Sequence, residues 1–193
     1  NMNYILTDKE PKLPLKYFED ISAIPHGSYN EKAISAFIAD TAAKLGLYAR
    51  VDERNNVVVK KPATPGYEHL PALLLQAHVD MVNEKNSDSD HDFTKDGLKL
   101  ILEGNILRAD GTTLGADDGK GVAYMLALMD SDSDTFPHPP LEFLFTTGEE
   151  VGFWGAMALD CSDITARRMI GLDAGPEGVV ATTSAGAQEV IFS

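Results

Sequence analysis

The chain has 193 residues, of which 44% are apolar, and its composition indicates a globular domain with a sizeable core rather than a disordered chain. Its 16 Lys and Arg against 30 Asp and Glu give a net charge of −14, which argues against binding to nucleic acid or to anionic membranes. The lone Cys161 cannot form an internal disulfide, and the first residues lack the basic and apolar blocks of a signal peptide. We therefore expect a cytoplasmic location.

The first part of the chain predicts two helices, a hairpin and a buried strand. Apolar residues recur at helical spacing before Pro25, and again between Asn30, a suitable N-cap, and Gly46, a suitable stop. The apolar run that ends at His78 reads as a strand. The predicted elements are helices over residues 15–24 and 30–45, hairpin strands over 47–51 and 57–60, and a strand over 73–78.

The second part alternates strands with helices, which predicts an α/β layered fold. A loop with several glycines, residues 110–121, separates a second hairpin from a helix. The predicted elements are hairpin strands over 98–102 and 106–109, a helix over 122–129, a strand over 141–147, a helix over 152–159, and strands over 169–172, 179–183 and 188–192.

His78 and Asp80 follow the strand over residues 73–78 and alternate along the chain. Residues i and i+2 of a strand point to the same side, so the carboxylate of Asp80 can lie behind the imidazole of His78 and orient it. This arrangement suits a metal-binding histidine with its supporting carboxylate. Taken alone, the pair is more often a hydrogen-bonded structural feature, so further acidic groups must converge on it.

Further acids lie at other predicted strand ends or in the glycine-flanked loop: Asp117 and Asp118, Glu149 and Glu150, and Asp173. Reactive groups of α/β sheets collect at the carboxyl edge of the strands. Each acid also has a structural explanation as an N-cap, a helix N-terminus or a turn residue. Their joint occurrence indicates a hydrolase with two metal ions, which needs bridging and terminal carboxylates, an imidazole and a free base.

Other readings of the sequence fit less well. The loop from Gly115 to Lys120 lacks the spacing and the Ser or Thr of a phosphate-binding loop. The acidic runs 88–92 and 130–134 lack the glycine and glutamate that a calcium loop requires. No catalytic role is assigned to Cys161 or to four of the five histidines, namely His26, His69, His91 and His138.

Five blocks of the sequence together resemble a known family. They are Ala77-His78-Val79-Asp80-Met81-Val82, His91-Asp92-Phe93, the segment Gly111 to Gly119, Thr147-Gly148-Glu149-Glu150-Val151-Gly152, and Leu172-Asp173. The chain is similar to the co-catalytic zinc peptidases that include aminoacyl-histidine dipeptidase, peptidase T and glutamate carboxypeptidase, and within this family it is most similar to the aminoacyl-histidine type. The resemblance implies a three-layer α/β catalytic domain with a mixed, mostly parallel sheet flanked by helices.

The same resemblance implies a role for each candidate residue. Asp117 would bridge two Zn²⁺ ions, with Co²⁺ or Mn²⁺ as alternatives. His78 and Asp173 would complete one metal's shell, and Glu150 would belong to the other. Asp80 would hold the ring of His78, and Glu149 would be the general base. A cis peptide bond is expected between Asp117 and Asp118.

The family also continues beyond the motifs found here, with a lid domain and a final histidine ligand. We therefore expect residues 1–193 to be the N-terminal portion of the catalytic domain, with an incomplete second metal site and no activity alone. The expected substrate is a small peptide such as an aminoacyl-histidine dipeptide of the carnosine type. Tripeptides, N-acyl amino acids and a non-catalytic binding module remain as alternatives, and a homodimer through the lid of the full-length protein is a further expectation.

Overall fold

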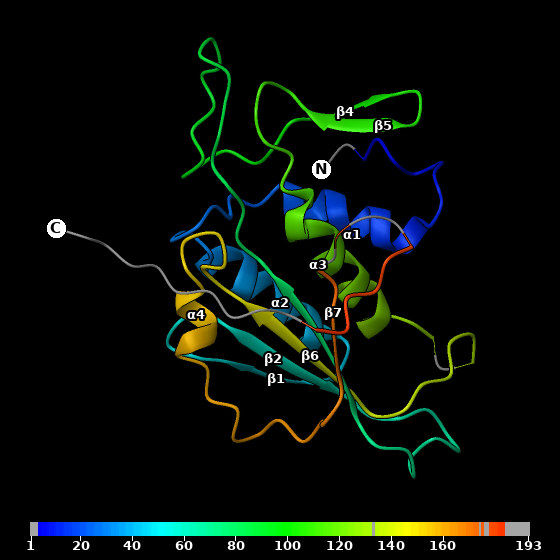
Figure 1. Cartoon of the computed structure of the whole chain (residues 1–193). Helices are drawn as coiled ribbons and strands as arrows, with labels where there is room; N and C mark the ends of the chain where they lie inside the picture. Colours follow the sequence, from blue (N-terminus) through cyan, green and yellow to red (C-terminus); the bar gives the residue numbers. More distant parts are fainter. Residues whose placement is uncertain (1–3, 133, 174, 176–177, 184–193) are drawn as a thin grey trace, which may run out of the picture.

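The computed structural model describes residues 4–132, 134–173, 175 and 178–183, and it has an α/β architecture (Figure 1). A five-stranded sheet has the strand order β1-β2-β6-β3-β7, and a separate two-stranded sheet pairs β4 with β5. The elements in chain order are α1 (Lys12–Ser22), α2 (Lys32–Lys44), β1 (Tyr48–Val51), β2 (Val57–Lys61), β3 (Leu73–His78), β4 (Leu100–Glu103), β5 (Ile106–Ala109), α3 (Ala116–Met129), β6 (Leu141–Thr146), α4 (Trp154–Met157) and β7 (Met169–Gly171).

The strand directions explain where functional groups can gather. β1 and β6 both pair antiparallel with β2, whereas β3 pairs in parallel with β6 and with β7. Four of the five strands therefore run the same way, and only β2 runs against them. The mixed, mostly parallel sheet expected from the sequence is confirmed, and the neighbouring strands β6, β3 and β7 all end at one edge.

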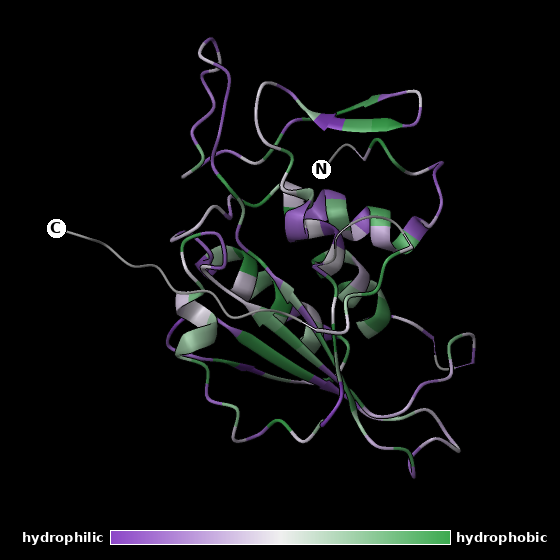
Figure 2. Cartoon of the chain, in the orientation of Figure 1, coloured by the Kyte–Doolittle hydropathy of each residue, from purple (hydrophilic) through white to green (hydrophobic). Residues whose placement is uncertain are grey.

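The two faces of the sheet have separate apolar cores. Alternate residues such as Val57, Val59 and Phe143 pack with buried residues of α1, α2 and α3 on one face. Val58 and Leu144 point to the other face and pack with residues that follow α4. Figure 2 shows the apolar character of the central strands. Helices on one face and the segment around α4 on the other give the three layers.

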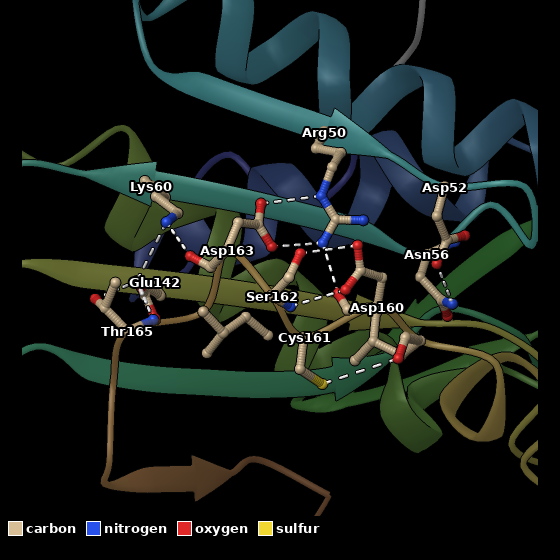
Figure 3. A network of polar contacts seen from close by, with 12 residues as sticks. Arg50, Asp52, Asn56, Lys60, Glu142, Asp160, Cys161, Ser162, Asp163 and Thr165 are labelled. Atoms are coloured by element: carbon tan, nitrogen blue, oxygen red, sulfur yellow. Dashed lines mark hydrogen bonds and ion pairs between the residues drawn. The ribbon is translucent and has the colours of Figure 1, made fainter.

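The segment between α4 and β7 is held on the second face by a polar network (Figure 3). The carboxylate of Glu142, 3% exposed on β6, accepts hydrogen bonds from the backbone N–H of Thr165 at 3.0 Å and of Ala166 at 2.9 Å. Arg50 of β1 pairs with Asp163, with Nη2 to Oδ1 at 2.6 Å. These contacts attach the segment that leads into β7.

The C-terminal end of α3 is capped by a lysine from β2. The Lys61 ammonium donates to the carbonyls of Leu128, Met129 and Ser131 at 2.8 to 3.0 Å and to the Ser131 hydroxyl at 3.0 Å. The last carbonyls of a helix have no partner within the helix, so a cation there satisfies them and interacts favourably with the helix dipole. Burial lowers the pKa of Lys61, and nearby Asp130 and Asp132 oppose this effect.

Most predicted elements are present with shifted ends. The helix expected over 122–129 already begins at Ala116, inside the predicted loop, although Asp117 and Asp118 have non-helical backbone angles. The helix expected over 152–159 is only the single turn Trp154–Met157. Residues 179–183, expected as a strand, form none, and Val179 and Val180 are exposed. The strand expected over 188–192 lies outside the described residues, and no helix among the described residues has the length and apolar content to cross a bilayer.

Candidate metal centre

The register of the parallel strands brings His78 and Asp173 to the same edge and the same face. Gln76 of β3 lies beside Leu144 of β6 and Gly171 of β7. His78, at the end of β3, and Asp173, just after β7, each come two residues after this pair and continue in the same side-chain direction. The His78 Nε2 atom lies 3.8 Å from Oδ2 of Asp173.

The imidazole of His78 is 1% exposed and is fixed on both sides. Its Nδ1 lies 2.9 Å from the backbone carbonyl of Asp80 and 3.5 Å from the Asp80 carboxylate. A carbonyl can only accept, so Nδ1 carries the hydrogen and Nε2 faces the acids, 3.1 Å from Oδ1 of Asp117. The expected orienting role thus falls first on the Asp80 carbonyl and second on its carboxylate.

The Asp80 carboxylate is fully buried and ties together separate segments. It accepts hydrogen bonds from the hydroxyl of Ser28 at 2.8 Å and from the backbone N–H groups of Glu149 at 3.0 Å and Glu150 at 3.3 Å. Burial alone would raise the pKa of Asp80, but the hydrogen bonds from His78, Glu149 and Ser28 outweigh it and hold the pKa below its usual value. Asp80 is therefore an anion that contacts the ring of His78 and the backbone of Glu149 and Glu150.

Glu149 and Glu150 follow β6 in a tight turn that begins at Gly148. Gly148 has φ +62°, and a Cβ there would lie 1.6 Å from Nε1 of Trp154, so only glycine fits. Burial raises the pKa values of both Glu149 and Glu150 despite the opposing effect of His78, and surrounding acids including Asp117 raise them further. The turn thus brings two carboxylates to the histidine.

Asp117 and Asp118 are joined by the cis peptide bond that the family resemblance implies. The side chain of Asp117 is 68% exposed and faces His78, whereas Asp118 is fully buried. Asp118 Oδ1 accepts from the N–H of Gly121 at 3.2 Å, as a cap of the regular part of α3, and its Oδ2 has no partner among the described residues. Burial raises the pKa of Asp118 to about 7.

These residues fit a site for divalent metal. His78 with Asp117 and Asp173, and His78 with Glu149 and Glu150, form two groups whose possible ligand atoms lie within 4.8 Å of one another. An imidazole nitrogen surrounded by carboxylate oxygens is a donor set that zinc accepts. Mutual repulsion contributes to the raised pKa values of Glu149 and Glu150, and a bound dication would relieve it.

A pocket opens beside the acidic cluster. It has a volume of about 300 Å³, and Glu149 and Asp173 line it together with apolar side chains that include Phe153, Leu159 and Met169. Pockets for small ligands combine apolar walls with a few polar groups. This pocket can therefore hold a small side chain next to the carboxylates.

Two residues near the site carried no sequence signal. Ser28, in the loop between α1 and α2, is 52 residues from Asp80 in the chain yet donates directly to it. His26 is 3% exposed, with Nδ1 2.6 Å from the carbonyl of Ile24, and burial lowers its pKa. Its backbone carbonyl accepts from the N–H of Met81. Only knowledge of which loop packs against the end of β3 would have identified either residue.

Comparisons with known proteins show what the chain is similar to. The chain is 39% identical over 94% of its length to a cytosol non-specific dipeptidase of Escherichia coli and covers 37% of that protein. It resembles the crystal structure of an aminoacylhistidine dipeptidase from Vibrio alginolyticus, with a TM-score of 0.85 and 40% identity, over 90% of this chain and 35% of that one. A tripeptidase from Staphylococcus aureus matches with a TM-score of 0.71 and 27% identity, over 85% of this chain and 43% of that one.

The chain thus spans little more than a third of the length of the E. coli and Vibrio dipeptidases. The resemblance to dipeptidases that the motifs indicated is confirmed. The family model of Peptidase family M28 matches residues 56–170, which include all the candidate site residues except Asp173. The match covers more than half of the sequence, and the chain belongs to peptidase family M28.

Proposed function

We propose that this chain carries the catalytic centre of a zinc-dependent dipeptidase that hydrolyses short peptides, including aminoacyl-histidine dipeptides such as carnosine. The observation that carries the proposal is the convergence of four carboxylates on the single imidazole of His78 at the edge of three parallel strands. The names of the E. coli and Vibrio relatives support a dipeptidase. The E. coli relative's name also supports the expected cytoplasmic location.

In this proposal His78, Asp117 and Asp173 would hold one metal ion, and Glu150 together with Asp117 would hold the second. Two Zn²⁺ ions are proposed, with Co²⁺ or Mn²⁺ as alternatives. Bound zinc would polarise the scissile carbonyl and lower the pKa of a water molecule towards ~7. The further ligand of the second ion, and a lid that could form a homodimer, are proposed to lie outside residues 1–193, so that the chain is one portion of the catalytic domain.

Glu149 is the proposed general base. Its carboxylate lies in the acidic cluster and lines the apolar pocket, so it can face both the water and the peptide. It would take a proton from the attacking water and pass it to the departing amine as the C–N bond breaks. Asp80 takes no proton in this scheme; it holds the ring of His78 and the backbone of the loop that carries Glu149.

The test compares the full-length protein with its Glu149→Ala variant, using purified protein whose zinc content is measured. We expect the variant to keep its zinc and to lose about 10²- to 10⁴-fold in kcat, the usual contribution of a general base. Unchanged hydrolysis by the variant would remove Glu149 as the base. Absence of hydrolysis by the unmodified, zinc-loaded protein would favour a non-catalytic binding module.

A second candidate substrate class is supported by the likeness to the Staphylococcus tripeptidase. β-Alanyl-histidine, a tripeptide and an N-acyl amino acid should be compared at equal concentration. The dipeptidase proposal expects the highest kcat/KM for the dipeptide. A higher value for the tripeptide or for the N-acyl amino acid would identify the corresponding alternative.

A further inference from the structure

The carboxylate of Asp80 connects three segments that are distant in sequence. Oδ1 accepts from the N–H of Glu149 at 3.0 Å and lies 3.5 Å from Nδ1 of His78. Oδ2 accepts from the hydroxyl of Ser28 at 2.8 Å and from the N–H of Glu150 at 3.3 Å. The orientation of this one carboxylate therefore affects both the histidine ring and the backbone of the loop that carries the two glutamates.

Ser28 approaches Asp80 from a segment that is itself anchored. Gly27 forms a parallel bridge with Met81, and the backbone N–H of Ser28 donates to the Met81 carbonyl at 3.3 Å. The N–H of Met81 donates in return to the carbonyl of His26 at 3.2 Å. A Cβ on Gly27 would lie 2.1 Å from the side chain of Asn83, which would have to move to admit it. The Ser28 hydroxyl is thus delivered by a fixed backbone.

The Ser28 hydroxyl makes the shortest hydrogen bond to the Asp80 carboxylate, and a charged acceptor strengthens such a bond. Without it, Oδ2 would keep only the 3.3 Å bond from Glu150, and the carboxylate could rotate about its Cβ–Cγ bond. The His78 ring would then rest mainly on the Asp80 carbonyl at 2.9 Å. The shared carboxylate would then hold the ring and the glutamate loop less firmly, through the N–H groups of Glu149 and Glu150 alone.

We propose that Ser28 is a positioning residue: its hydroxyl fixes the Asp80 carboxylate and, through it, the ring of His78 and the loop that carries Glu149 and Glu150. This inference rests on the proposed function for its catalytic consequence. Its structural consequence, the orientation of the His78 ring, can be measured without any reaction. The two parts can therefore fail separately.

The test uses Ser28→Ala, the conservative variant Ser28→Thr and the control Ser162→Ala in the full-length protein. Ser162 is a matched control because its hydroxyl also donates to an aspartate carboxylate, Oδ2 of Asp160 at 2.9 Å, on the surface between α4 and β7. Three quantities are measured: the ring ¹⁵N resonances of His78 at fixed pH in protein stripped of metal, the affinity for Zn²⁺ by competition with a chromogenic chelator, and kcat and KM on β-alanyl-histidine.

We expect Ser28→Ala to shift the His78 resonances, to weaken Zn²⁺ binding about threefold to tenfold and to lower kcat by a similar factor with little change in KM. Ser28→Thr should restore all three quantities, and Ser162→Ala should change none of them. If Ser28→Ala does not fold, Ser28→Cys replaces it with the same expectations, because a thiol is a weak donor.

Unchanged His78 resonances and unchanged Zn²⁺ affinity in folded Ser28→Ala would overturn the inference, even if the protein hydrolyses peptides. Shifted resonances and weaker Zn²⁺ binding in a protein whose unmodified form hydrolyses no peptide would support the positioning role and reject the proposed function instead.

Discussion

Replacing Glu142 by glutamine should destabilise the fold and loosen the segment that leads into β7. The Glu142 carboxylate accepts from Thr165 through its N–H at 3.0 Å and its hydroxyl at 2.8 Å, and from the N–H of Ala166 at 2.9 Å, with Lys60 at 3.5 Å (Figure 3). Glutamine keeps one acceptor oxygen and turns an NH₂ group towards donors. Hydrogen bonds to a charged group contribute about 1.5 to 3 kcal/mol each, but Thr165 is exposed and water compensates in part, so we expect a loss of about 2 kcal/mol.

The loss of stability caused by Glu142→Gln should depend on pH. Burial would raise the pKa of Glu142, but the hydrogen bonds from Ala166 and Thr165 and the charge of Lys60 outweigh it and lower the pKa from 4.5. The ionised carboxylate therefore stabilises the folded state above its unfolded pKa, and this stabilisation disappears as the pH falls through the lower folded value. The difference in free energy of unfolding between Glu142 and the glutamine variant should be full at about pH 7 and should narrow below about pH 4.

Urea unfolding followed by circular dichroism measures this difference, with Glu68→Gln as the control at an exposed glutamate that should change stability by less than about 0.5 kcal/mol. Hydrogen exchange should show that Glu142→Gln accelerates exchange of the amides of residues 165–171 more than exchange of the amides of β2. A Glu142→Gln variant within about 0.5 kcal/mol of the unmodified protein at pH 7, or a difference that stays constant at low pH, would refute the reasoning.

Two further substitutions test the α3 cap and the glutamate turn. Lys61→Met should lower the free energy of unfolding by about 1 to 3 kcal/mol, because it leaves the last carbonyls of α3 without their cation. Urea unfolding measures this loss. A loss no larger than that of Lys44→Met, at an exposed lysine, would contradict the capping role. Gly148→Ala should destabilise the protein by more than about 2 kcal/mol and weaken Zn²⁺ binding, because its Cβ would overlap Trp154. The control Gly46→Ala, at φ +71° with open space around it, separates the backbone cost from the overlap, and equal losses in the two variants would show that the overlap is unimportant.

The sequence predicts the parts of the fold and site that depend on local patterns. The apolar run ending at His78 reveals β3 and its edge, and the acids in the glycine-flanked loop and after the strand before Gly148 single out Asp117, Glu149 and Glu150 as candidates. Side-chain alternation correctly suggests that His78 and Asp80 are related, but it cannot tell that the Asp80 carbonyl lies closer to the ring than the carboxylate does. That detail depends on how the chain turns after the strand.

Long-range contacts account for what the sequence did not reveal. Ser28 reaches Asp80 only because the loop after α1 bridges Met81, and no local pattern records that bridge. The early start of α3 was missed because glycines and aspartates at residues 115–121 are typical of a loop. The alternative reading of these aspartates as an N-cap fits Asp118, whose carboxylate caps the regular part of the helix. The apolar pattern of residues 179–183 is typical of a strand. A strand also needs a partner, however, and among the described residues no strand pairs with this segment.

The parallel alignment of β6, β3 and β7 has a consequence for how the centre could evolve or be redesigned. Neighbouring strands lie about 4.8 Å apart, so the sheet sets the spacing between the strand ends that lead into His78, Glu149 and Asp173, whereas Asp117 comes from the start of α3. A change of side-chain type at the edge can alter which ion is preferred while the spacing stays the same. A slip of β3 by one residue would turn His78 towards the helices and abolish the centre in a single step, so the hydrogen-bonded pairing of the strands protects the chemistry as much as any individual ligand does.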